Sequence, residues 1–156
     1  MNKTDITLRI IQNLKQELMQ AIHAAEEAHK GATHEQSKAE TQYDTIGLEH
    51  AYLAEGQSRR IDELQSDMSK LENWVAPSYS IDDEIYLGAI VKLENCQDKH
   101  NMRVFITPAG GGQLIQPEGL QVITPLTPLG KILMGRSEGD NATINNGKSY
   151  LIMDIQ

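Results

Sequence analysis

The positions of proline and glycine divide this chain of 156 residues into two unlike halves. Residues 1–75 contain no proline and three glycines, and they are rich in Ala, Glu, Gln, Leu and Lys, which favour helices. All five prolines and the other nine glycines lie in residues 76–156. Because proline and glycine interrupt regular structure, the second half must consist of short elements, and we place a linker at residues 76–80.

The first half predicts two long helices, each with apolar residues spaced by three and four. The first stripe comprises Ile11, Leu14, Leu18, Ala21 or Ile22, Ala25 and Ala28, and the second comprises Ile61, Leu64, Met68, Leu71 and Val75. Each stripe needs one partner helix. We therefore expect residues 1–75 to form an antiparallel coiled-coil hairpin, with an intermolecular coiled coil as the alternative.

The tip of this hairpin is predicted at residues 31–40. Gly31 is expected to end the first helix as a C-terminal cap. Ser37 and Glu40 have the S-x-x-E spacing of a capping box for the second helix. Glu35, Glu40 and Asp44 are carboxylates in or just after this turn, and they either bind a ligand or are simply solvated.

The second half shows the alternation and β-branched content of strands. Strands are expected over residues 88–94, 102–107, 120–124 and 149–155, and a structural turn over 109–112. One short helix has marks at both ends, since Thr127 is a capping residue, Pro128 occupies the first helical position and Gly135 follows the last turn. The expected fold class is α+β, with a helical hairpin followed by a small antiparallel sheet domain with one short helix.

Composition excludes several functions. The net charge of −8 opposes binding to a nucleic-acid backbone. A single cysteine, Cys96, and the lack of a recognisable secretion signal indicate a reducing cytoplasm. No apolar run approaches the roughly 18 residues that span a membrane. The five histidines do not show zinc-ligand spacing with cysteine partners.

The segment "VITPLTPLGKILMGRSEGD" (122–140) resembles the C-terminal signature of the Gre family, the bacterial transcript-cleavage and elongation factors. "YLIMDI" (150–155) and "GAIVKLEN" (88–95) extend the resemblance. It implies a coiled-coil hairpin joined to an FKBP-like domain, residues 81–156, that docks on RNA polymerase. The family makes that contact in the segment that here holds Thr127, Pro128, Leu129 and Gly135.

The resemblance also implies a mechanism. The hairpin would enter the secondary channel of the polymerase, where tip carboxylates help to hold a Mg²⁺ ion in the polymerase active site. The polymerase would then cleave the nascent RNA of a backtracked complex. The protein would be no enzyme itself, would have no cofactor of its own, and would meet nascent RNA only indirectly. We expect a cytoplasmic monomer.

The family's two tip acids correspond to Gln36 and Ala39, so this sequence departs from the family pattern there. Glu35 and Glu40 stand beside those positions and are the candidate catalytic and Mg²⁺-binding residues. Asp44, one turn beyond Glu40, is a further candidate. The departure leaves open a second function, in which the protein occupies the channel without stimulating cleavage.

Two other functions are weaker. A peptidyl-prolyl isomerase would need an aromatic-lined pocket. For that the second half offers Tyr79, Tyr86, Phe105 and Tyr150, and no Trp. A dimerising coiled coil with a scaffold domain is the other alternative.

Overall fold

The computed structural model describes residues 1–33, 46–80 and 82–156; for residues 28, 29, 31–33 and 46–54 only the backbone is described. It contains two long helices, α1 (Lys3–Thr33) and α2 (Ile46–Glu72), followed by six strands and one short helix. The elements group into two compact units. One comprises Gln12–Ser69, and the other comprises Met1–Ile11 together with Lys70–Gln156. The start of α1 and the end of α2 therefore belong to the same unit as the sheet.

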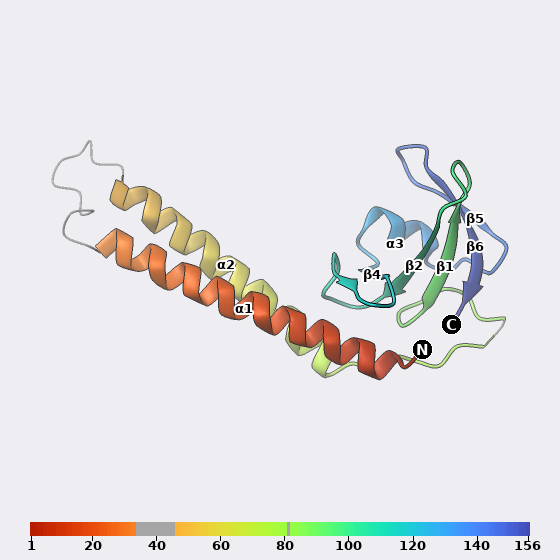
Figure 1. The fold of residues 1–156 in the computed structure, drawn as a ribbon, viewed down its shortest axis with the longest axis horizontal. Coiled ribbons are helices and arrows are strands. Elements are labelled where there is room, and N and C mark those ends of the chain that lie inside the picture. The colour runs from red at the N-terminus through yellow and green to blue at the C-terminus, as the bar shows by residue number, and fades with distance from the viewer. Residues whose placement is uncertain (34–45, 81) are drawn as a thin grey trace. The chain divides into compact units, whose positions relative to one another are not determined.

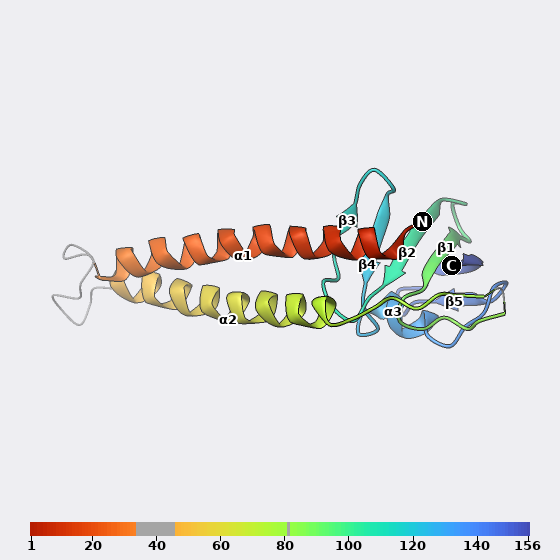
Figure 2. The ribbon, with the colours of Figure 1, turned by 90° about the horizontal axis from the view of Figure 1, so that it is seen from below.

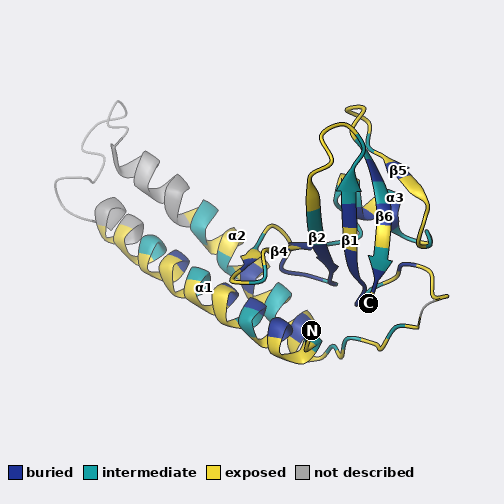
Figure 3. Cartoon of the chain, turned by 45° about the vertical axis from the view of Figure 1, so that its right-hand side comes forward, coloured by how far each residue is buried: buried dark blue, intermediate teal, exposed yellow. Residues whose placement is uncertain are grey.

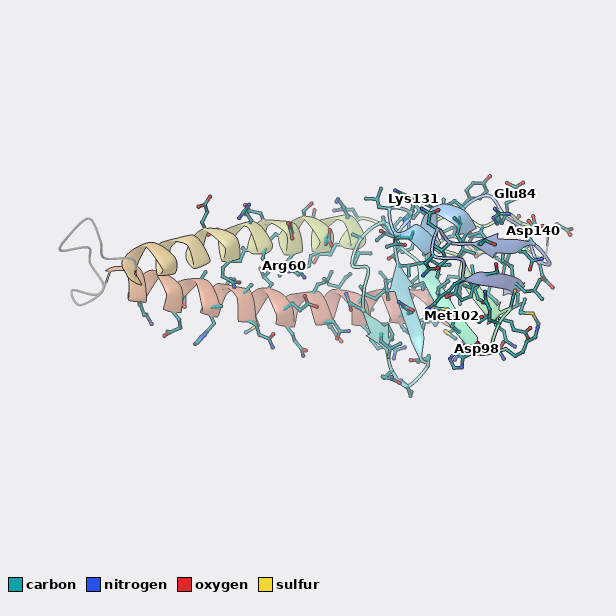
Figure 4. The ribbon with its side chains drawn as sticks, turned by 90° about the horizontal axis from the view of Figure 1, so that it is seen from above. Arg60, Glu84, Asp98, Met102, Lys131 and Asp140 are labelled. Carbon is teal, nitrogen blue, oxygen red and sulfur yellow. The ribbon has the colours of Figure 1, made fainter. Side chains whose placement is uncertain are left out.

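The helix pair is antiparallel, as predicted. Glu17 of α1 forms an ion pair of 2.8 Å with Arg60 of α2, so the middle of one helix faces the middle of the other. Figures 1 and 2 both show the two helices side by side, and Figure 4 shows Arg60 between them. The seam follows the predicted spacing, since Leu14, Ala21 and Leu64 are buried.

Two details of the helical prediction are wrong. Gly31 lies inside α1, which continues to Thr33; a glycine within a helix costs only about 1 kcal/mol relative to alanine, so it does not have to end one. Val75 is 85% exposed, because α2 ends at Glu72 and the stripe ends with it. Of the two alternatives for the first stripe, Ala21 is buried and Ile22 is exposed. The Ser37–Glu40 capping box lies outside the described residues.

The sheet has the strand order β3-β4-β2-β1-β6-β5. The four predicted strands are present as β1 (Ile90–Asn95), β2 (Asn101–Ile106), β4 (Leu120–Ile123) and β6 (Ser149–Ile155). Two short strands, β3 (Leu114–Ile115) and β5 (Asn141–Thr143), were not predicted. Among the described residues, the helix pair, the mixed sheet and the short helix α3 (Pro128–Leu133) confirm the expected fold class.

One strand pair departs from the antiparallel pattern. β4 pairs with β2 in parallel, with Phe105 opposite Val122, whereas the other pairs are antiparallel. The chain reverses twice between β2 and β4, through β3, and so returns in its original direction. The predicted turn at 109–112 makes the first reversal, where the Thr107 hydroxyl donates to the carbonyl of Ala109 at 2.8 Å. Sequence alternation does not reveal this pairing, because it specifies the faces of a strand and not its neighbours.

The two faces of the sheet bury different partners. Ala89, Val91 and Leu93 point together into a core that also contains Leu133 of α3. Phe105 is fully buried and its ring centroid lies 6.0 Å from that of Trp74, just beyond α2. Figure 3 shows these buried residues running along the central strands.

Candidate functional site

The predicted tip carboxylates Glu35, Glu40 and Asp44 lie outside the described residues, as do Gln36 and Ala39. The other predicted site residues, those of the docking segment, lie within the described part of the chain. These are Thr127, Pro128, Leu129 and Gly135, in and around α3.

Thr127 caps α3 as the sequence predicts. Its backbone is extended (φ −70°, ψ 154°), and its hydroxyl accepts a hydrogen bond of 3.1 Å from the amide of Gly130. The same hydroxyl donates to the carbonyl of Thr124 at 2.8 Å. Pro128 follows at the start of the helix, where its missing N–H leaves no hydrogen bond unmade. Thr127 thus fixes both the helix and the segment that precedes it.

Gly130 is a site residue that the sequence reasoning missed. A Cβ atom there would lie 2.0 Å from the carbonyl oxygen of Thr124, which is backbone and has no room to withdraw. The segment before α3 therefore lies directly on the helix, and only glycine permits this approach. The signal in the sequence was a glycine in the interior of a six-residue helix, a position that glycine otherwise disfavours.

Gly135 ends the helix with a left-handed backbone (φ +75°), as a residue after the last turn often does. Its amide donates to the carbonyl of Ile85 at 2.7 Å, and the amide of Ile85 donates to the carbonyl of Arg136 at 2.8 Å. The Arg136 Nε donates to the carbonyl of Ile132 at 2.6 Å. The end of α3 is thus held by two strand-like hydrogen bonds and one side-chain cap.

The apolar residues in and beside α3 differ in exposure. Leu129 is partly buried and packs against the core. Leu126, one residue before the cap, is 82% exposed. Lys131 is also exposed on the helix, and Figure 4 labels it. A partner that contacts this surface would meet an apolar side chain at Leu126, just before a capped helix.

The alternative of a peptidyl-prolyl isomerase finds little support in the positions of the aromatic residues. Phe105 and Tyr150 are buried in the protein interior, and Tyr86 is 53% exposed. Tyr79 is half-buried and donates its hydroxyl to the carbonyl of Leu87 at 3.2 Å. Because Phe105 and Tyr150 are buried, they do not line an open pocket of the kind that an isomerase needs.

The described residues hold no group of three or more His, Cys, Asp or Glu side chains that could bind a metal ion. In the same part of the chain, no helix is both long enough and apolar enough to cross a bilayer. Cys96 is partly buried, with its sulfur 3.8 Å from the side-chain oxygen of Asn141.

Residues 80–156 match the family model "Transcription elongation factor, GreA/GreB, C-term". No curated protein matches the sequence.

Several solved structures are similar in fold. GreA factor homolog 1 (Gfh1) of Thermus thermophilus is 23% identical, with a TM-score of 0.41 over 94% of each chain. Gfh1 of Thermus aquaticus is 26% identical, with a TM-score of 0.42 over 93% of this chain and 92% of that chain. A GreA/GreB elongation factor from Nitrosomonas europaea is 15% identical, with a TM-score of 0.37 over 60% of this chain and 78% of that chain.

Proposed function

Because the chain belongs to the GreA/GreB family of transcription elongation factors through its C-terminal domain, we propose that it acts on RNA polymerase by inserting its helix pair into the secondary channel. There it stimulates cleavage of nascent RNA in backtracked complexes. The polymerase performs the hydrolysis, and this protein supplies positioning and charge. The observation that carries the proposal is the family match over residues 80–156.

The surface around α3 is the proposed docking site. Its support is the capped helix of Thr127 and Pro128, with Leu126 exposed beside it. An exposed apolar side chain next to a capped helix is a suitable contact for a protein partner, because the backbone there is already ordered and loses little entropy on binding. We propose that the protein docks as a monomer, which light scattering would report near the chain mass of 17.4 kDa. A dimer that persists on dilution would instead favour an intermolecular coiled coil.

The proposed role of Glu35 and Glu40 rests on the chemistry of their side chains. Carboxylate oxygens are ligands that Mg²⁺ prefers, and Mg²⁺ usually takes only one or two of them while it keeps several waters. Two carboxylates brought to the polymerase active site would suffice to strengthen a weakly held second metal ion. Such an ion orients water and stabilises charge in the transition state.

A second candidate function is a channel-binding regulator that does not stimulate cleavage. It is favoured by one specific observation, namely that Gln36 and Ala39 occupy the positions where the family pattern has acids. The two candidates share the docking surface and differ only in the outcome of the cleavage assay.

The experiment that tests docking is competition for purified RNA polymerase against a labelled copy of the same protein. The double variant Leu126→Asp/Thr127→Ala puts a charge at the exposed apolar side chain and removes the cap, which is worth about 1 kcal/mol. It should compete poorly while it remains folded by circular dichroism. Thr127→Ser is the matched control, because it keeps the capping hydroxyl. A folded double variant that competes as well as wild type would place the docking site elsewhere.

A further inference from the structure

A row of charged residues crosses the sheet at three neighbouring strands. In register, Lys92 of β1 lies opposite Arg103 of β2 on one side and opposite Asp154 of β6 on the other. Figure 1 shows these three strands side by side. The row therefore begins with two cations that face each other directly. Like charges in this position destabilise a sheet, and the single negative charge of Asp154 balances only one of the two cations.

The two cations have different surroundings. Arg103 is half-buried, and its Nη2 donates to the carbonyl of Glu118, which holds the guanidinium in place. Lys92 is exposed, and its side-chain ammonium makes no ion pair or hydrogen bond with any residue that the structure describes. The carboxylate of Asp154 accepts a hydrogen bond of 2.8 Å from the side-chain amide of Gln156. The row thus presents a fixed cation beside an unpaired one.

A hollow of about 430 Å³ lies over this row. Ile90 and Met153 line it together with the charged residues and Gln156. Its volume is within the range of roughly 300–1,000 Å³ that holds small ligands. Ile90 is almost fully buried, and Met153 is 37% exposed. The hollow therefore combines two cations with an apolar, polarizable wall, in a chain whose net charge is −8.

We propose that Lys92 and Arg103 bind the diphosphate group of a nucleotide, with its base against Met153. A diphosphate carries enough charge to satisfy both cations at once, whereas a single carboxylate does not. The planar guanidinium of Arg103 matches phosphate oxygens in a two-pronged hydrogen bond, and its attachment to Glu118 prepares it for this contact. The thioether of Met153 suits the edge of an aromatic ring. Asp154 opposes the phosphate and limits the affinity.

Calorimetric titration of the full chain tests this proposal without polymerase, so its result is separate from that of the docking experiment. ADP should bind more tightly than inorganic pyrophosphate, and adenosine should not bind measurably. Lys92→Gln should weaken ADP binding at least tenfold, and Arg103→Lys several-fold. Lys148→Gln, which changes another exposed lysine of the same unit, should leave it unchanged. Asp154→Asn should tighten binding, because it removes the opposing charge.

A loss of ADP binding can be distinguished from a loss of folding. Lys92→Gln removes the like-charge contact with Arg103 and the opposite-charge contact with Asp154, so it should melt near the wild-type temperature. Equal affinity of Lys92→Gln and wild type for ADP would overturn the proposal, as would equal binding of adenosine and ADP. An acidic peptide that binds at Lys92 while ADP does not would also overturn it and would assign the row to a protein partner.

Discussion

Arg9 in the second turn of α1 binds Glu118, in the loop between β3 and β4, through two parallel hydrogen bonds. Its Nη1 and Nη2 lie 2.9 and 2.7 Å from the two carboxylate oxygens, and Nη1 also donates to the carbonyl of Gln116 at 2.8 Å. A guanidinium that meets a carboxylate in this way fixes orientation as well as charge. The hydrogen bond from Arg9 is the largest cause that lowers the pKa of Glu118, and it also raises the pKa of Arg9.

This pair predicts a pH dependence of stability. The pKa of Glu118 is lower in the folded protein than in the unfolded chain, so the stabilisation is complete above the unfolded pKa. It is lost as the pH falls through the lower, folded pKa. Urea unfolding from neutral pH to about pH 3 should therefore show a smaller loss of stability in Glu118→Gln than in wild type. Glu63→Gln, in an exposed pair of 3.4 Å with Arg60, is the control and should behave as wild type. If the free energy of unfolding falls equally with pH in wild type and in Glu118→Gln, the pH dependence does not come from Glu118.

Lys3 predicts a pH dependence of the same sense at alkaline pH. Its ammonium donates to the carbonyl of Pro77 at 3.0 Å and lies 4.4 Å from the ring centroid of Tyr79. Burial lowers the pKa of Lys3 from 10.5 to about 8. Between these values the unfolded chain binds more protons than the folded one, so the free energy of unfolding should rise with pH.

The measurement is the stability of wild type relative to Lys3→Met at about pH 7.5 and about pH 9.5. The relative stability of wild type should increase between them, and a titration of the Lys3 amine by NMR should have its midpoint near 8. A flat or falling difference would mean that the Pro77 carbonyl and the Tyr79 ring hold the positive charge against the effect of burial.

Gly130→Ala should destabilise the protein by about 1–3 kcal/mol, the usual cost of overfilling a packed site. The reason is the 2.0 Å approach of a Cβ atom to the carbonyl oxygen of Thr124. Gly56→Ala is the matched control, since no atom lies within 4 Å of a Cβ there and the residue is in α2. It should stabilise the protein by up to about 1 kcal/mol through helix propensity. Thermal unfolding of both variants gives the comparison, and a neutral Gly130→Ala would show that the segment before α3 can move away.

Glu35→Gln/Glu40→Gln should fold and still compete for polymerase, yet lose stimulation of RNA cleavage in stalled complexes. Substitutions in a turn like the predicted one usually change stability by less than about 0.5 kcal/mol. Raising the Mg²⁺ concentration should restore part of the activity, because a weaker site fills at higher metal concentration. Asp44→Asn should have a smaller effect.

Two outcomes of this experiment would redirect the proposal. If the double Gln variant cleaves as well as wild type, these carboxylates are not the catalytic ones. If wild type blocks the channel without stimulating cleavage, Gln36→Asp/Ala39→Glu is the variant that should gain activity, and the second candidate function holds.

Local signals in the sequence were sufficient for the helix seam and for α3. Leu14 and Leu64 follow from periodicity, and the roles of Thr127, Pro128 and Gly135 follow from the chemistry of helix ends. Each of these features is decided within a few residues of chain. The role of the tip carboxylates Glu35 and Glu40 remains a prediction.

Other features depend on contacts between distant residues, which a single sequence does not reveal. β3 has two residues and β5 has three, so neither is long enough to show alternation. The close approach of Gly130 to Thr124 depends on how the preceding segment lies on the helix. The exposed Leu126 and the facing pair Lys92 and Arg103 likewise depend on the register and solvent exposure of the folded chain.

The assignment of residues 1–11 to the unit of the sheet has a consequence for how the protein is made. A Cβ atom at Gly110 would meet Ile10 at 2.9 Å and Leu71 at 3.2 Å, so the first turns of α1 and the end of α2 both lie against a loop of the sheet. On the ribosome, Ile10 is synthesised 100 residues before Gly110, so it lacks this contact until Gly110 has been added to the chain. A fragment that begins at residue 80 would expose the apolar surface that Ile10, Leu71 and Trp74 cover, and would be prone to aggregate when it is produced alone.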